Sequence, residues 1–101
     1  MPLVARGDGV DVVNTGHPVC VEPGIIATLS CSTDVFVHNV GVHRKGDTNT
    51  PHTHCPPVFS TTVSSFSPNV FVNGLEVARQ DDSYTCGAFI QQVTQTDVFA
   101  N

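Results

Sequence analysis

Tryptophan is absent from this chain of 101 residues, and aromatic residues as a group make up only 7% of it. Charged residues are also scarce, at 13%, and nine Asp and Glu outnumber the four Lys and Arg, which gives a formal net charge of −5. A surface with so few cations offers no basic patch to a phosphate backbone. We therefore expect no nucleic acid among the partners of this protein.

Long apolar segments are missing as well. No run of apolar residues approaches the roughly 18 that are needed to cross a bilayer, and residues 1–6 contain no apolar stretch of the kind that directs secretion. We expect a single domain over residues 1–101, without a signal peptide and without a fused extension. A domain of this size has a modest core, so an additional cross-link would stabilise it.

What the chain does contain is a repeat. Three blocks end in Val-Phe, at residues 32–36, 67–71 and 95–99. Three further blocks combine Arg with a nearby Asp and alternate with the first set; they lie around Arg6, Arg44 and Arg79. Val and Phe favour strands, and no segment has the pattern of an amphipathic helix, so the predicted fold class is all-β. Three short units, each too small to bury a core alone, have to pack together, which suggests pseudo-threefold symmetry.

The Val-Phe blocks predict short strands. In each block the Val side chains should face one way and the Phe side chain the other, because side chains alternate along a strand. The Asn73-Gly74 pair is a strong signal for a hairpin turn, and Asn39-Val40-Gly41 stands in the same place in the first unit. Further short strands are expected around residues 25–30, 58–65 and 88–94.

These interleaved blocks resemble the PAAR-repeat family, in which Ser-Pro-x-Val-Phe-Val-Asn-Gly and Pro-Ala-Ala-Arg-x-Gly-Asp segments recur. The clearest match runs from Ser67 to Arg79. The resemblance implies a small cone with a triangular base, a pointed vertex and one zinc ion near the vertex. It also implies a function. The protein would be a structural tip, not an enzyme, that caps and sharpens the trimeric β-helical spike of a type VI secretion system or contractile phage tail for membrane piercing.

The same resemblance implies the partners and the location of the protein. One chain would seat on each spike trimer, any effectors would bind non-covalently, and the target-cell membrane would be met only transiently. The protein would be found at the tip of a virion tail spike, or in the bacterial cytoplasm before injection out of the cell.

The polar segments that follow the Arg blocks carry His and Cys residues. If the three units converge at one end, these segments together offer the four N or S ligands of a closed tetrahedral site. The preferred ligands, which match the three-His, one-Cys site that the resemblance implies, are His17, His52, His54 and Cys86. Cys55 competes for the place of His52 or His54, and Cys20 competes for the place of His17. With four protein ligands the Zn²⁺ would be structural, since no position stays open for water or substrate.

The four cysteines also allow a different interpretation, a small disulfide-linked secreted binding module. Four cysteines permit three pairings, and a Cys20–Cys55 disulfide is the pairing that competes directly with metal binding. The lack of a secretory segment gives metal binding at least equal weight.

The remaining polar residues have structural roles in this interpretation. We expect Cys31 to be a small core residue. His38 and His43 should face solvent or a neighbour and bind no metal. Arg44 and Arg79 should pair with nearby Asp or with carbonyl groups in their turns.

Overall fold

The computed structural model describes residues 1–16, 24–53 and 58–101, and all regular secondary structure in these residues is β. The strands are β1 (Val12–Asn14), β2 (Ile25–Ala27), β3 (Phe36–Val37), β4 (Val40–Gly41), β5 (His52–Thr53), β6 (Val58–Phe59), β7 (Phe71–Val72), β8 (Leu75–Glu76) and β9 (Phe89–Gln92). Within the described ranges, no helix has the length and hydropathy that crossing a bilayer requires. The all-β class predicted from the repeats is confirmed.

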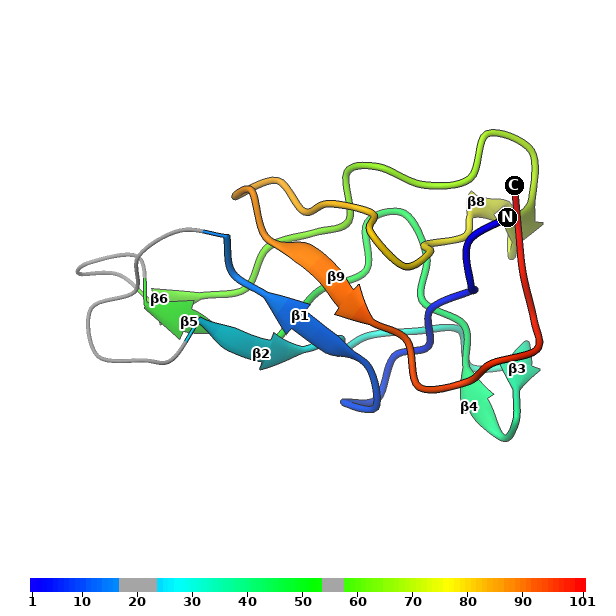
Figure 1. The fold of residues 1–101 in the computed structure, drawn as a ribbon, viewed down its shortest axis with the longest axis horizontal. Coiled ribbons are helices and arrows are strands. Elements are labelled where there is room, and N and C mark those ends of the chain that lie inside the picture. Colours follow the sequence, from blue (N-terminus) through cyan, green and yellow to red (C-terminus); the bar gives the residue numbers. More distant parts are fainter. Residues whose placement is uncertain (17–23, 54–57) are drawn as a thin grey trace.

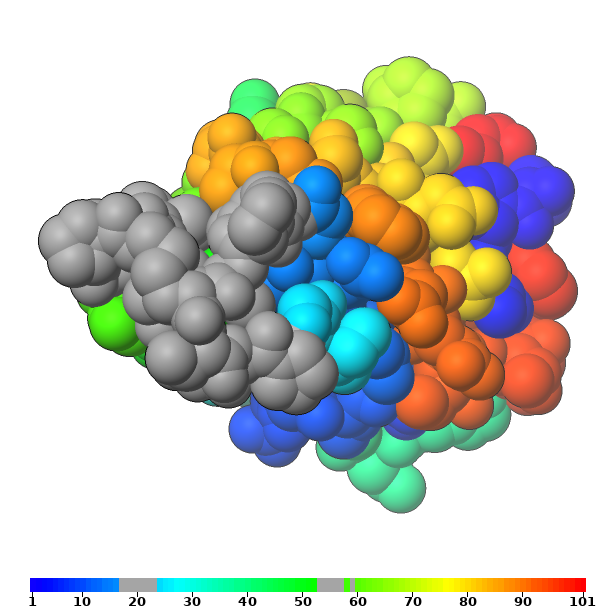
Figure 2. Space-filling view, turned by 60° about the vertical axis from the view of Figure 1, so that its left-hand side comes forward, coloured from blue at the N-terminus to red at the C-terminus, as the bar shows by residue number. Residues whose placement is uncertain are grey.

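Strands β2, β1 and β9 form an antiparallel sheet in that order, and they follow one another across the surface in Figure 2 as cyan, blue and orange. Val13 at the centre pairs with Ile26 on one side and Ile90 on the other. The side chains of Val13 and Ile90 are fully buried, so one face of this sheet forms part of the core. The strands expected near residues 25–30 and 88–94 are confirmed by β2 and β9.

Two hairpins repeat one geometry in the first and second units. The first strand of each hairpin comes from a Val-Phe block: Phe36 pairs with Gly41 in β3–β4, and Phe71 pairs with Glu76 in β7–β8. Each hairpin is therefore the structural product of one repeat, as the sequence predicted for Asn73-Gly74.

The turns of these hairpins have positive φ at both central residues. The values are 49° and 69° for His38 and Asn39, and 55° and 77° for Asn73 and Gly74, as a type I′ turn requires. The prediction that the first turn covers residues 39–41 is wrong by one position, because residues 40 and 41 already form β4. Asn tolerates the left-handed conformation that Gly adopts in the second turn, which is why the hairpin forms without Asn-Gly.

The third Val-Phe block finds its partner at the other end of the sequence. Phe99 pairs with Leu3, and the Val4 N–H donates to the Val98 carbonyl at 2.9 Å. The first residues of the chain thus take the place that β4 and β8 have in the other two units. Figure 2 shows the first residues (blue) and the last (red) side by side.

A closed ring of backbone hydrogen bonds joins the three units. The residues that precede the three Arg form it: the His43 N–H donates to Ala5 O (3.0 Å), the Ala5 N–H to Ala78 O (2.9 Å), and the Ala78 N–H to His43 O (2.9 Å). Each unit is therefore bonded to both of the others. These main-chain hydrogen bonds confirm the expectation that the three units pack on one another.

The alternation predicted for the Val-Phe blocks determines what lies inside and what lies outside, with the exception of Val35, which is 38% exposed. Valines from all three units form one buried cluster, in which Val4, Val42, Val77 and Ala100 are packed against Val37, Val70, Val72 and Val98. The three Phe face the other way and are exposed by 57%, 54% and 50% at Phe36, Phe71 and Phe99. A second cluster lies under the three-stranded sheet and includes Val13, Tyr84 and Ile90.

The molecule is elongated, with extents of 35 × 23 × 22 Å, and its two ends are built from different elements. The hairpin β3–β4, strand β8 and both termini lie at one end of the long axis, and strands β5 and β6 lie toward the other (Figure 1). We call the first the hairpin end: β3–β4, β7–β8 and the pair formed by residues 2–4 and 98–100. We call the second the β5–β6 end, which includes His52 and Cys86.

Candidate metal centre

Two of the predicted ligands meet at the β5–β6 end. His52 is the first residue of β5 and only 3% of its surface is exposed, while Cys86 is half-buried in the turn that precedes β9. The His52 Nε2 atom lies 3.7 Å from the Cys86 Sγ atom. The Thr61 hydroxyl lies 3.2 Å from the same sulfur. Residues 34 positions apart in the chain are thus brought within contact distance.

The imidazole of His52 is oriented by the main chain. Its Nδ1 lies 2.8 Å from the Thr50 carbonyl oxygen, and because a carbonyl only accepts, Nδ1 has to carry the proton. The other ring nitrogen, Nε2, then faces Cys86. A carbonyl on the far nitrogen is the usual orienting contact of a histidine that binds a metal.

The separation of the two donor atoms can be compared with what a metal requires. A tetrahedral ion with bonds of about 2.0–2.1 Å to nitrogen and about 2.3 Å to sulfur places these two atoms roughly 3.5–3.6 Å apart. The observed 3.7 Å is close to that value. The pair therefore fits two corners of a zinc tetrahedron as well as it fits a weak hydrogen bond.

The other predicted ligands cannot be compared in this way. His17 and His54 lie outside the described residues, and so do the competing ligands Cys20 and Cys55. Among the residues that are described, no group of three His, Cys, Asp or Glu gathers in a way that could hold a metal ion. The structure brings together His52 and Cys86 and leaves the remaining ligands as predictions.

The described cysteines are free thiols. Neither Cys31 nor Cys86 is in a disulfide, so a framework of two disulfides, which would need all four cysteines, is not what this fold contains. Cys31 packs against two glycines, since a Cβ added at Gly7 would lie 2.5 Å from the Cys31 Cβ and one at Gly41 would lie 2.8 Å from its Sγ. Burial, followed by the charges of nearby carboxylates, raises the pKa of the Cys31 thiol. Its expected role as a small packed residue agrees with these contacts.

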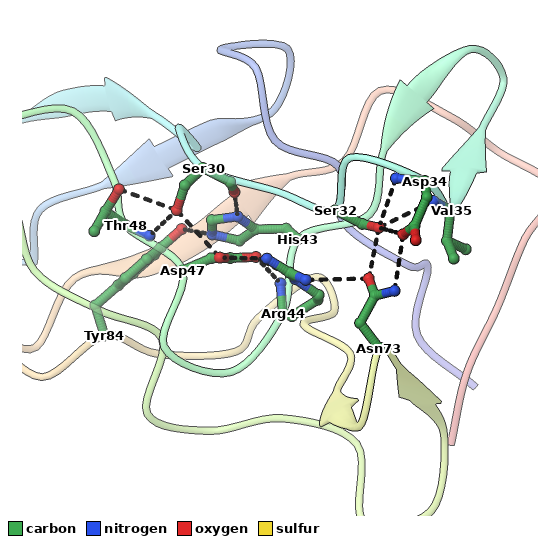
Figure 3. Close-up of polar contacts among 10 residues, drawn as sticks. All are labelled: Ser30, Ser32, Asp34, Val35, His43, Arg44, Asp47, Thr48, Asn73 and Tyr84. Atoms are coloured by element: carbon green, nitrogen blue, oxygen red, sulfur yellow. Dashed lines mark hydrogen bonds and ion pairs between the residues drawn. The ribbon is translucent and has the colours of Figure 1, made fainter.

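A buried polar network lies between the two ends, and no pattern in the sequence predicted it. His43 is fully buried; its Nδ1 lies 2.7 Å from the Ser30 carbonyl oxygen and its Nε2 lies 2.7 Å from the Tyr84 hydroxyl. Figure 3 shows the ring held between these two groups. Burial lowers the pKa of His43 and raises the pKa of the Tyr84 phenol. The ring is therefore kept neutral, with Nδ1 donating and Nε2 accepting.

The network continues from the core toward the hairpin end through Arg44. Its Nε and Nη2 donate to the two carboxylate oxygens of Asp47 at 2.9 and 3.1 Å, and its Nη1 donates to Asn73 Oδ1 at 3.1 Å. Asn73 in turn donates to Asp34 at 2.8 Å and accepts from the Ser32 hydroxyl at 2.6 Å, as Figure 3 shows. The turn of β7–β8 is thus tied by side chains to the unit that precedes it.

The three Arg blocks differ in how their side chains are used. Arg44 and Arg79 both pair with the Asp three residues later, with Nε–Oδ2 distances of 2.9 Å, as predicted, and the hydrogen bond raises the pKa of each Arg. Arg6 is more buried, and its Nη2 donates to the Thr94 hydroxyl at 2.8 Å instead. The first unit therefore keeps the backbone of the repeat without its ion pair.

The comparison with known families agrees with this architecture. The family described as PAAR motif matches residues 11–92, which is most of the chain. A comparison of this chain with the curated proteins found no match. The protein belongs to the PAAR-motif family. It is a spike-tip-type protein of contractile injection systems. The match leaves out the first Arg block and the last Val-Phe block, the two segments that the structure pairs with each other.

Proposed function

We propose that this chain is a pseudo-threefold cone that caps and sharpens the trimeric β-helical spike of a type VI secretion system or contractile phage tail for membrane piercing. The observation that carries this proposal is the hairpin end. One chain supplies three strand pairs around a shared valine cluster and joins them by a closed ring of three backbone hydrogen bonds. A single chain can therefore present three equivalent contacts to the three subunits of a spike, with the β5–β6 end pointing away.

We also propose that one structural Zn²⁺ stabilises the β5–β6 end. His52 and Cys86 would hold it together with His17 and His54; Cys55 is the alternative at the place of His52 or His54, and Cys20 is the alternative at the place of His17. A closed site of four protein ligands supplies rigidity and no open position for a reacting water, which is why we infer a structural role without enzyme activity. Strands β5 and β6 pair over only two residues each, and a metal cross-link would stabilise this short hairpin.

The capping role is tested by mixing the full chain with the purified β-helical tip segment of its trimeric spike. Native mass spectrometry should give one chain per spike trimer. A complex of three chains per trimer, or no complex, would contradict the proposal.

The metal is tested separately. Elemental analysis of the purified protein should give one zinc per chain, and an anomalous-scattering map should show which four side chains hold it. Effectors, if present, would be detected as non-covalent partners in pulldowns from the producing cell or virion.

A further inference from the structure

The sulfur of Cys86 has a second polar neighbour besides His52. The Oγ1 atom of Thr61 lies 3.2 Å from the Cys86 Sγ atom, and only 6% of the surface of Thr61 is exposed. A hydroxyl can either donate to a sulfur or accept from a thiol, and the two cases have opposite effects on a negatively charged sulfur. The direction of this hydrogen bond therefore decides what Thr61 does at the β5–β6 end.

Thr61 is itself held by a buried amide, that of Asn49. Three hydrogen bonds join the two residues: the Asn49 N–H donates to the Thr61 carbonyl (3.1 Å), the Thr61 N–H donates to Asn49 Oδ1 (2.9 Å), and Asn49 Nδ2 donates to Thr61 Oγ1 (2.9 Å). Asn49 is fully buried. The main chain and the side chain of Thr61 are therefore both fixed by one residue.

The orientation of the amide follows from its partners. A main-chain N–H only donates, so the Asn49 atom that faces the Thr61 N–H has to be the oxygen. The atom that faces the Thr61 hydroxyl is then the nitrogen, which only donates. The hydroxyl oxygen thus accepts from Asn49, and its own hydrogen needs a different acceptor. Among the described contacts of Thr61, the sulfur of Cys86 is the atom that can accept it.

This direction suits a sulfur that binds a metal. A cysteine that coordinates a metal ion is a thiolate, which has no proton to donate and can only accept hydrogen bonds. A hydroxyl that already accepts from an amide, and has its hydrogen left for the sulfur, is complementary to a thiolate. A hydroxyl without such a partner could turn and accept from a thiol instead.

Comparison of the three units shows that the amide is not a general requirement of the fold. In each unit an Asp accepts a hydrogen bond from the main-chain N–H of the Arg that precedes it, and the residue two positions after this Asp is buried. These residues are Val13, Asn49 and Tyr84. An amide buried at a position where another unit has Val costs free energy unless its polar atoms are paired. The pairing of Asn49 with Thr61 accounts for the amide in the second unit.

We propose that Thr61, oriented by Asn49, is a positioning residue of the zinc site: its hydroxyl donates a hydrogen bond to the Cys86 thiolate and directs the sulfur toward the metal. Neither Thr61 nor Asn49 binds the metal itself. Hydrogen bonds to the ligands of a metal orient these ligands and change the charge that they give to it. This inference rests on the Zn²⁺ proposed above and adds the residues that hold one of its ligands in place.

The experiment removes the Thr61 hydroxyl from the full chain. Thr61→Val keeps the branched shape of the side chain and takes away the donor, whereas Thr61→Ser keeps the donor. The affinity for Zn²⁺ is measured by competition with a chromophoric chelator. Thr61→Val should weaken it about 10- to 100-fold, and Thr61→Ser should retain most of the native affinity. Thr62→Val is the matched control, because it removes the hydroxyl of the next residue, which is less buried and whose side chain points the other way along an extended chain.

A second measurement separates positioning from loss of stability, because Thr61→Val also leaves Asn49 Nδ2 without its partner. Co²⁺ can replace Zn²⁺ at a site with a sulfur ligand, and it gives an absorption band in which charge moves from the thiolate to the metal. A sulfur that loses a hydrogen bond gives up charge more readily, so this band should move to longer wavelength in Thr61→Val. It should stay in place in Thr61→Ser and in Thr62→Val.

Weaker Zn²⁺ binding together with a shifted cobalt band in Thr61→Val alone supports the inference. A Thr61→Val chain that binds Zn²⁺ like the native chain, or that has an unshifted band, overturns it and leaves the structural zinc intact. Equal losses of affinity in Thr61→Val and Thr62→Val also overturn it, since they would come from packing. A native chain without measurable affinity for Zn²⁺ overturns the zinc proposal and, with it, this inference.

Discussion

Main-chain hydrogen bonds join distant segments at both ends of the molecule, for example from the Thr50 N–H to the Ala27 carbonyl (2.9 Å) next to β5, but the two ends differ in how these bonds are arranged. The hairpin end is held mainly by the main chain: three strand pairs, a ring of hydrogen bonds through Ala5, His43 and Ala78, and a valine cluster beneath them. At the β5–β6 end the described contacts between distant segments include side-chain pairs such as His52 with Cys86. Strands β5 and β6 add a hairpin of two residue pairs.

This difference explains why the two ends vary differently among the repeats. Main-chain bonds do not depend on the side chain, so the equivalent positions Leu3, Gly41 and Glu76 hold three unrelated residues in one geometry. A metal site, by contrast, depends on the side chain of each of its ligands. The segments that carry His52 and Cys86 are accordingly not copies of each other. The two ends should therefore fail independently, and each of the following experiments perturbs one end or the boundary between them.

Removal of the proposed zinc should have the largest effect, and it should be confined to the β5–β6 end. Structural zinc contributes on the order of 10 kcal/mol of apparent binding energy, and a loss of a few kcal/mol lowers the melting temperature of a domain of this size by more than roughly 10 °C. Scanning calorimetry before and after chelation measures this. Hydrogen exchange should show faster exchange in β5 and β6, with the amides of Ala5, His43 and Ala78 still protected. An unchanged melting curve after proven metal removal would argue against the site.

Gly41→Ala should destabilise the hairpin end. The new Cβ would overlap with the Ser32 carbonyl oxygen and lie 2.8 Å from the Cys31 Sγ, and the bond from the Ser32 N–H to the Val42 carbonyl keeps these segments together. Overpacking against a fixed main chain costs about 3 kcal/mol, which urea unfolding would measure.

The matched control for this variant is Gly46→Ala. Gly46 has open space around it but a φ of +82°, so its replacement costs only the backbone strain, about 1–2 kcal/mol. Equal losses of unfolding free energy in Gly41→Ala and Gly46→Ala would show that the packing around Gly41 is looser than the structure indicates.

Acid should destabilise the buried polar network between the two ends, because this network contains His43. Burial lowers its pKa in the folded protein, while in the unfolded chain the pKa is about 6.5. Below about pH 6.5 the unfolded state therefore binds a proton that the folded state excludes. Stability should fall with decreasing pH by up to about 1.4 kcal/mol per unit from this group and be unaffected by it above pH 7.

The contribution of His43 is isolated by comparing the native chain with His43→Gln in urea unfolding at pH 7.5, 6.5 and 5.5. The groups that act on this imidazole through their charge are Asp11, Asp47 and Arg44, and all three stay in the variant. The variant should lose less stability on acidification than the native chain. Identical slopes would mean that His43 takes up its proton in the folded state as readily as in the unfolded one.

The sequence predicted the hairpin end well because the information there is local. Alternation over three residues predicted which way Val and Phe face, except at Val35, which is 38% exposed, and Asn73-Gly74 predicted a turn. It did not predict that residues 2–4 complete the third pair, because Leu3 and Phe99 are separated by almost the whole chain. No pattern in the sequence showed that Arg6 lacks the ion pair of the other units. The carboxylate of Asp11 accepts a hydrogen bond from the main-chain N–H of Arg6.

For the β5–β6 end, the sequence predicted only a set of candidate metal ligands. The positions of His52 and Cys86 after their Arg blocks predicted that they would meet, and they do. The choice among His54, Cys55 and Cys20 depends on distances between segments that no local pattern encodes. The His43–Tyr84 pair was missed for the same reason: its partners come from different units, and only the packing of those units buries them.

The smallest effect is expected at the rim of the hairpin end, where His38 of the first unit reaches Asp97 of the third, with 2.6 Å between Nε2 and Oδ1. Their side chains are 54% and 64% exposed, so water and salt screen the pair and the coupling should stay below about 0.5 kcal/mol. A double-mutant cycle with His38→Ala and Asp97→Ala measures it. The corresponding contact between the second and first units, Asn73 with Asp34, has further bonds to Ser32 and Arg44, and Asn73→Ala should cost more than either change at the His38–Asp97 pair. A coupling above about 1 kcal/mol that persists in 1 M salt would mean that side chains at the rim, and not only the main-chain ring, hold the three units together.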